Sequence, residues 1–152
     1  MEIRYALASD VPRVQTLLQE YIDWIGLDLA FQEIDAELVG LPGDYAPPRG
    51  ALLVACRHDQ PVAMIGLREF TGTIGEMKRL YVQPSARGHG LARALILRLL
   101  EEACVLGYSE IRLDTLPMMG DAQAMYLTLG FRDIEPYYET PIAGTRFMAL
   151  RL

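Results

Sequence analysis

A glycine-containing loop, Arg87-Gly88-His89-Gly90-Leu91-Ala92, carries the clearest chemical signal in the sequence. It lies between a predicted strand and the start of the longest predicted helix, where unpaired backbone N–H groups and the positive end of the helix dipole meet. Its glycines let the backbone approach an anion closely. From Glu76 to Arg98 there are five Lys and Arg residues and one Glu, which leaves a local charge of +4. The loop predicts a polyphosphate-binding site; a tight turn before a solvated basic helix face is the alternative.

Two other kinds of phosphate loop do not fit this sequence. A Walker loop needs G-x-x-x-x-G-K-[ST], and no Lys-Ser or Lys-Thr pair occurs in the chain. The dinucleotide fingerprint needs a third small residue at position 93, which is Arg93, and it normally opens a fold rather than falling in the middle of the chain. Both are therefore disfavoured.

A second pattern follows the loop along the chain. Ala122, Tyr126, Gly130 and Phe131 fit A-x-x-x-Y-x-x-x-G-F, while Arg87, Gly90 and Ala92 fit R/Q-x-x-G-x-G/A. Together, in the region from Glu76 to Phe131, these motifs resemble those of the GNAT N-acetyltransferase superfamily. One position departs from the family pattern, because Met119 stands where the family often carries an asparagine.

The resemblance implies acetyl-CoA as the acyl-donor cosubstrate, with no metal. By it, the backbone N–H groups of Arg87, Gly88, His89, Gly90, Leu91 and Ala92 would hold the CoA pyrophosphate. The strand ending in Leu80, Tyr81 and Val82 would pair with the pantetheine arm. We expect His89, inside the loop, to be solvent-exposed or to contact a phosphate rather than to act as a base.

Acetyl transfer to an amine needs a neutral nucleophile, stabilisation of the oxyanion and a proton for the leaving thiolate. Tyr126 matches the family tyrosine near the CoA sulfur, and a phenol can protonate a thiolate, so Tyr126 is the candidate general acid. Glu76 matches a position from which some family members supply a general base. A buried structural tyrosine and a surface glutamate at a strand end are the respective alternatives.

The acceptor is expected to approach near Asp114, at the end of the neighbouring strand, and Glu69, in a hairpin strand; either carboxylate would bind the charge of an amine. From Asp10 to Asp44 there are eight acidic residues and one Arg, which favours a cationic small-molecule amine or, equally, a solvated helix face. The segment from Pro136 to Gly144 is predicted to form a loop over the site, with Tyr137 or Tyr138 touching the acceptor.

The elements that must position these residues follow from the hydrophobic periodicity. We expect strands at Ile3–Ala8, Gly75–Val82 and Glu110–Thr115, a hairpin from Ala51 to Leu67, and two final strands around Phe131 and at Arg146–Leu152. Helices are expected from Val11 after an N-cap at Ser9 or Asp10, at Phe31–Val39, from Leu91, and at Ala122–Leu129. This order predicts a mixed α/β (α+β) sheet. The resemblance implies the acyl-CoA N-acyltransferase fold, whose mostly antiparallel sheet is splayed at the cofactor site and flanked by helices.

Length and composition limit what can be expected for the number of domains, the binding partners and the location of the protein. With 152 residues and a formal net charge of −6, the chain is expected to form one domain, 1–152, and not to bind nucleic acid. Two cysteines support neither a disulfide framework nor a cysteine-based zinc site, and no segment suits a membrane span. We expect a cytoplasmic monomer or homodimer that acetylates a primary amine of a small molecule in a ternary complex. A non-catalytic acyl-CoA sensor and a protein or peptide N-acetyltransferase stay open as alternatives.

Overall fold

One seven-stranded sheet, ordered β1-β2-β3-β4-β5-β7-β6, runs through the centre of the protein. The computed structural model describes all residues from Met1 to Leu152. The strands are β1 (Glu2–Tyr5), β2 (Ala51–Arg57), β3 (Gln60–Thr71), β4 (Ile74–Val82), β5 (Glu110–Thr115), β6 (Arg132–Asp133) and β7 (Arg146–Arg151). Neighbouring strands are antiparallel except β4 and β5, which are parallel. The predicted mixed, mostly antiparallel sheet is confirmed.

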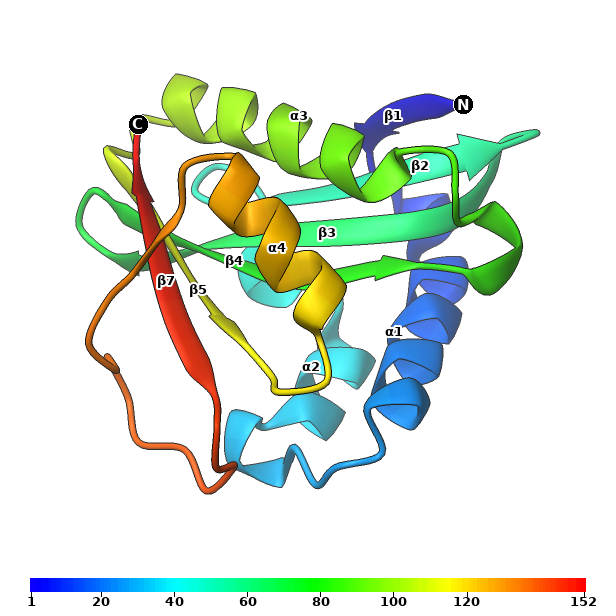
Figure 1. Ribbon diagram of the computed structural model, residues 1–152. Coiled ribbons are helices and arrows are strands. Elements are labelled where there is room, and N and C mark those ends of the chain that lie inside the picture. Colours follow the sequence, from blue (N-terminus) through cyan, green and yellow to red (C-terminus); the bar gives the residue numbers. More distant parts are fainter.

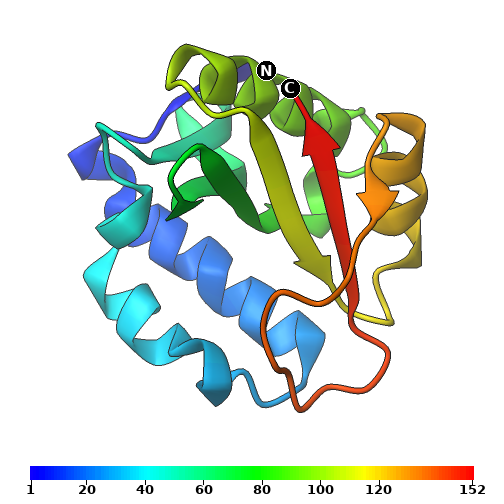
Figure 2. The ribbon, with the colours of Figure 1, turned by 90° about the vertical axis from the view of Figure 1, so that its left-hand side faces the viewer.

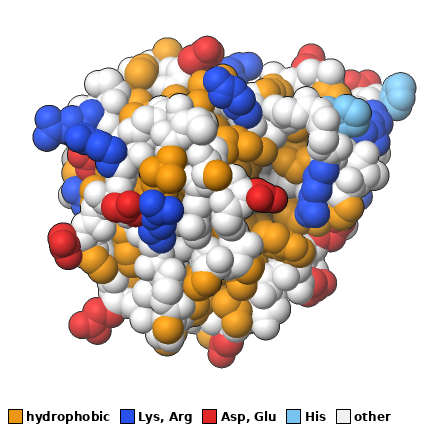
Figure 3. Space-filling model, viewed as in Figure 1, with side chains coloured by type: hydrophobic (Ala, Val, Ile, Leu, Met, Phe, Trp, Pro, Cys, Tyr) orange, Lys and Arg blue, Asp and Glu red, His pale blue; other side chains and the backbone are white.

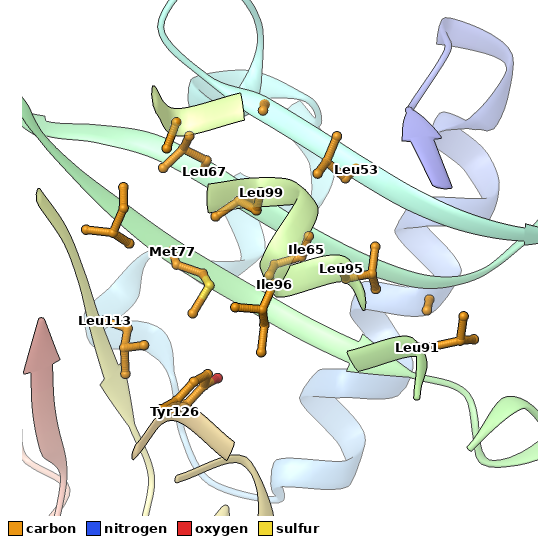
Figure 4. Packing of buried hydrophobic residues seen from close by; sticks show 14 of the residues in the cluster. Leu53, Ile65, Leu67, Met77, Leu91, Leu95, Ile96, Leu99, Leu113 and Tyr126 are labelled. Carbon is orange, nitrogen blue, oxygen red and sulfur yellow. The ribbon is translucent and has the colours of Figure 1, made fainter. Parts of the chain in front are cut away.

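Helices cover both faces of this sheet (Figures 1 and 2). They are α1 (Val11–Ile25), α2 (Ile34–Gly40), α3 (Leu91–Val105) and α4 (Gly120–Thr128). The α1 face carries α1 and α2, with one buried apolar cluster that includes Leu17, Leu18 and Val54. The α3 face carries α3 and α4, where Leu95, Ile96 and Leu99 pack on the sheet (Figure 4). The sheet thus has a separate hydrophobic core on each side, which fixes the positions of its strands.

Several predicted boundaries shift for local reasons. The first strand ends at Tyr5 rather than Ala8, because Ala8–Asp10 forms a 3₁₀ turn. The second helix is divided: Ala30–Gln32 is a 3₁₀ turn, and α2 begins at Ile34 after Glu33, whose φ of +55° is left-handed and incompatible with a continuous α-helix. The predicted bounds of β5 are confirmed. None of the helices combines the length and apolar composition needed to cross a membrane.

Asp10 occupies the predicted N-cap position of α1, but its side chain makes no capping hydrogen bond to that helix. The Asp10 carboxylate instead accepts hydrogen bonds from Arg4 Nη1 at 2.6 Å and from the Leu7 N–H at 2.7 Å. Asp10 is 6% exposed. It therefore ties β1 to the turn that leads into α1.

We predict that Asp10→Asn destabilises the fold by about 1–3 kcal/mol at neutral pH, because it weakens a buried charged hydrogen-bond pair. The Arg4 hydrogen bond, aided by the Leu7 N–H, holds the pKa of Asp10 below its usual value. Because the pKa of Asp10 is lower in the folded than in the unfolded protein, its ionised carboxylate stabilises the fold at pH values above the unfolded pKa of about 3.9. This stabilisation is lost as the pH falls through the folded-state pKa. Urea unfolding across pH should therefore show the difference between wild type and variant shrinking in acid.

The matched control is Asp59→Asn, in the exposed turn between β2 and β3, where a φ of +64° suits asparagine. Equal stabilities of the Asp10→Asn variant and the control at neutral pH would contradict the account.

Candidate active site

The strands β4 and β5 separate partway along their length. They pair only from Ile74 opposite Glu110 to Glu76 opposite Arg112. Beyond that point the edge of β4 that faces β5 has no ladder partner, so its N–H and C=O groups are open to an extended ligand. A cavity of about 430 Å³ occupies the gap and continues to both faces of the sheet. The predicted splay is thus present, at the predicted strand.

Residues from three parts of the fold line this cavity. The strands contribute Met77, Lys78, Arg79, Leu80, Tyr81, Val82, Leu113 and Asp114. The α3 face contributes Ala86, Arg87, Gly88, Gly90, Leu91, Ala92, Arg93, Asp121, Ala122, Met125 and Tyr126. The α1 face and the β5–α4 connection contribute Tyr21, Trp24, Leu29, Gln32, Leu116, Met118 and Met119. Figure 3 shows hydrophobic side chains gathered in a hollow beside α4.

A bulge in β4 lies just beyond Glu76, the last residue of β4 that pairs with β5. Met64 pairs with Tyr81 and Gly66 with Lys78, so Arg79 and Leu80 together face one residue of β3. Arg79 has a left-handed φ of +62°, a conformation that costs about 1–3 kcal/mol in a residue with a side chain. Bulges interrupt pairing and redirect a strand. This one lies in the part of β4 that has already separated from β5.

The Arg79 side chain holds the bulge through hydrogen bonds to two residues of the α1 face. Its Nε and Nη2 donate to the Glu37 carboxylate at 2.7 and 3.0 Å, and its Nη1 donates to Gln32 Oε1 at 2.7 Å. The side chain is 4% exposed. A planar guanidinium suits this two-point contact with a carboxylate. The pair therefore offsets the backbone strain of the bulge.

The glycine loop lies at the N-terminus of α3, on the α3 face of the cavity. Gly88 and Gly90 have φ values of +83° and +73°, which residues with a side chain rarely adopt. Gly90 is the N-cap and provides no side-chain cap, so the first N–H groups of α3 stay available to an anion. Arg87 Nε donates to the Val82 carbonyl at 2.9 Å and ties the loop to the end of β4. His89 is exposed and does not line the cavity.

Tyr126 reaches the cavity from α4 on the same face. Its side chain is 6% exposed, and its ring packs on Phe131 with centroids 5.6 Å apart. Figure 4 shows its hydroxyl oxygen directed away from α4. This hydroxyl has no hydrogen-bond partner among the residues of the protein, and burial raises its pKa above the usual tyrosine value. The group therefore keeps its proton at neutral pH and can donate it within the cavity.

A network of charged side chains lies on the α1 face of the gap. Glu76 accepts from Arg68 Nε at 2.9 Å and lies 3.9 Å from Lys78 Nζ, which in turn lies 3.3 Å from Asp114 Oδ1. With the pair formed by Glu37 and Arg79, the network holds three carboxylates and three cations. Burial lowers the pKa of Lys78, although Asp114 and Glu76 oppose this effect.

Two tyrosines of the segment between β6 and β7 close this network. The Tyr137 hydroxyl donates to Glu76 Oε2 at 2.7 Å, and the Tyr138 hydroxyl donates to Asp114 Oδ2 at 2.6 Å. Burial acts to raise the pKa of Asp114, but the Lys78 charge and the Tyr138 hydrogen bond outweigh it and lower that pKa. Figure 2 shows this orange-red segment crossing toward the α1 face. The predicted loop therefore forms, but its tyrosines bind carboxylates and do not line the cavity.

The structure brings together most of the residues that the sequence singled out, but not all. Ten of them line the cavity: Leu80, Tyr81, Val82, Arg87, Gly88, Gly90, Leu91, Ala92, Asp114 and Tyr126. Glu76 lies behind the wall with both carboxylate oxygens hydrogen-bonded. Glu69 is half-exposed, pairs with Arg49 at 3.3 Å and lies away from the cavity. Both oxygens of Asp114 are also hydrogen-bonded.

No acidic residue of the segment from Asp10 to Asp44 lines the cavity. The charge of that segment is used elsewhere: Glu20 accepts from Tyr81 and Gln83, and Glu37 binds Arg79. Sequence analysis missed Arg68, Lys78, Arg79 and Glu37 as members of the site network. The only signal for them was the unusual presence of charged residues inside apolar strands.

Comparison with known proteins agrees with the geometry of the site. Residues 12–131 match the acetyltransferase (GNAT) family. An uncharacterized N-acetyltransferase of Schizosaccharomyces pombe is 38% identical over 148 residues, which covers 96% of this chain and 91% of that relative.

Two solved structures share the fold. A GNAT-family acetyltransferase from Staphylococcus aureus superposes with a TM-score of 0.81 at 20% identity, covering 99% of this chain and 98% of the other. The PaiA N-acetyltransferase of Thermoplasma acidophilum, solved in complex with coenzyme A, superposes with a TM-score of 0.78 at 17% identity, with the same coverage.

We predict that Glu37→Gln lowers the free energy of unfolding by about 3 kcal/mol, because it leaves the buried Arg79 guanidinium without its counter-charge at a strained bulge. Urea unfolding measures the change. The control is Glu101→Gln on the exposed side of α3, which is expected to change stability by less than about 0.5 kcal/mol. Equal effects of the two substitutions would show that Arg79 does not depend on Glu37.

Proposed function

This chain belongs to the acetyltransferase (GNAT) family, and from that premise we propose that it transfers the acetyl group of acetyl-CoA to a primary amine of a small molecule. It is an acetyl-CoA-dependent N-acetyltransferase. The observation that carries the proposal is a cavity that crosses the sheet, with an anion-binding loop on one face and room for a second substrate on the other. We propose direct transfer between the two in a ternary complex.

The residues of the α3 face suit the CoA moiety. The N-terminus of α3 and the loop from Arg87 to Ala92 would hold the pyrophosphate through backbone N–H groups, with the positive charges of Arg87 and Arg93 beside them. The open edge of β4 at Leu80, Tyr81 and Val82 would receive the extended pantetheine arm. When bound, acetyl-CoA supplies the activated acetyl thioester. His89 is exposed and is at most a peripheral contact in this arrangement.

Tyr126 is the residue we propose as general acid. Its hydroxyl has no partner in the protein, and burial keeps it protonated. It lines the cavity opposite the open edge of β4, so it can hold a proton where a thiolate leaves. We propose that Glu76 acts as the base through its hydrogen-bond network rather than by direct contact with the amine. Both of its carboxylate oxygens already accept hydrogen bonds.

The acceptor side supports a small molecule rather than an extended peptide. The segment between β6 and β7 is fixed to the α1 face by the stacking of Tyr138 on Phe31, with ring centroids 6.4 Å apart. Tyr137 and Tyr138 are also hydrogen-bonded to the buried carboxylates. These contacts restrict the space that a peptide chain would need. A cytoplasmic location and a monomeric or homodimeric state stay predictions from the sequence.

The test measures release of CoA thiol from acetyl-CoA by the purified protein with small primary amines and with peptides. We predict turnover with small amines, and a loss of about 100-fold in kcat for Tyr126→Phe with an unchanged acetyl-CoA dissociation constant, because only the proton donor is removed. The control is Tyr5→Phe, whose hydroxyl binds Glu102 on α3 away from the cavity. Turnover only with peptides would refute the small-molecule acceptor, and full activity of Tyr126→Phe would refute the acid role.

A further inference from the structure

The cavity has two walls of different chemistry, one on each face of the sheet. The anion-binding loop and Tyr126 lie on the α3 face. If CoA occupies that face, as proposed above, the acceptor has to enter from the α1 face, between α1, the β5–α4 connection and the ends of β4 and β5. The chemistry of that second wall, here called the acceptor wall, therefore selects the acceptor. Its members are Tyr21, Trp24, Leu29, Gln32, Lys78, Arg79, Asp114, Leu116, Met118 and Met119.

The acceptor wall has only three charged residues, and each is already paired. Lys78 lies 3.3 Å from Asp114, and Arg79 makes a two-point contact with Glu37. The wider network is balanced, with three cations and three carboxylates. A second charge on the acceptor would find no free counter-ion among these wall residues and would lose hydration without compensation there; the unpaired carboxylate that lines the cavity, Asp121, belongs to α4.

The rest of the acceptor wall is mainly apolar. Leu29 and Leu116 are buried, and Tyr21 presents an aromatic ring. Trp24 and Met118 are 48% and 43% exposed although both are large apolar residues. Large apolar side chains half open to solvent at the rim of a cavity are typical of a surface that a ligand covers.

We propose that the acceptor is a monoamine whose nitrogen is attached to an apolar, preferably aromatic, group, and that carries no second charge. The apolar group packs between Trp24 and Met118, and the amine points to the gap between β4 and β5. An apolar wall without a free carboxylate also favours the neutral form of the bound amine, which is the nucleophilic form. This inference rests on the proposed acetyl transfer and narrows its acceptor. It opposes the cationic acceptor that the acidic N-terminal segment suggested.

Matched pairs of amines test the proposal by CoA-thiol release at one pH. Phenethylamine and phenylalanine differ by one carboxylate, and pentylamine and 1,5-diaminopentane differ by one ammonium group. We expect kcat/KM to be at least about tenfold higher for the singly charged member of each pair, the discrimination that roughly 1.4 kcal/mol of uncompensated desolvation gives. A preference for phenylalanine or for the diamine would overturn the proposal while acetyl transfer stands. No thiol release with any amine would overturn both.

Truncation of the wall gives a second, independent readout. Trp24→Ala should raise the KM for phenethylamine at least about tenfold and leave the KM for acetyl-CoA unchanged, because it removes an aromatic contact from the acceptor wall alone. Val105→Ala, an exposed residue at the far end of α3, is the control and should change neither.

Trp24 is the single tryptophan of the chain, so phenethylamine should change the intrinsic fluorescence of the CoA-bound wild-type protein saturably. An unchanged KM for phenethylamine in Trp24→Ala, or no fluorescence change on titration, would contradict a binding site on this wall.

Discussion

The site depends on the early end of the pairing between β4 and β5. Two parallel strands that separate in the middle of a sheet leave backbone groups and side chains without partners in the interior, where such groups are expensive to bury. The groups that surround the gap differ between the two faces of the sheet. On the α3 face, the separation leaves a cavity lined by the Tyr126 hydroxyl, by the charged side chains of Arg87, Arg93 and Asp121, and by a helix N-terminus. On the α1 face, charged side chains that bond to one another lie beside the gap.

The charge network is better understood as a device for geometry than as a source of stability. Buried ion pairs often contribute little to the free energy of folding, because desolvation offsets their attraction. Arg79 has to hold a left-handed bulge, however, and a guanidinium bound at two points by Glu37 fixes that backbone where a hydrophobic side chain would not. Because the network is internally balanced, it also leaves the neighbouring cavity wall without unsatisfied charge. The same contacts thus shape the cavity and limit what enters it.

Much of the fold could be predicted from local sequence. The glycine loop needs two left-handed residues directly before a helix, and Gly88 and Gly90 provide them at a spacing that is visible in the chain. The order of strands and helices follows from hydrophobic periodicity. The partners of the carboxylates could not be read in this way: Glu76 bonds to Tyr137, 61 residues later, and Arg79 bonds to Glu37, 42 residues earlier. The acidic N-terminal segment wrongly suggested a cationic acceptor, because a count of charges does not show which side chains turn inward. Those that do turn inward are already paired with other residues of the protein.

The central claim is that the open edge of β4 and the N-terminus of α3 together form the acetyl-CoA site. Hydrogen–deuterium exchange of the protein with and without acetyl-CoA tests it most directly, because amides that gain partners exchange more slowly. We expect slower exchange on binding in residues 79–82 and 88–93, with smaller changes in α1 and α2. Binding of acetyl-CoA that leaves exchange in both of these segments unchanged, or that protects only the α1 face, would contradict it.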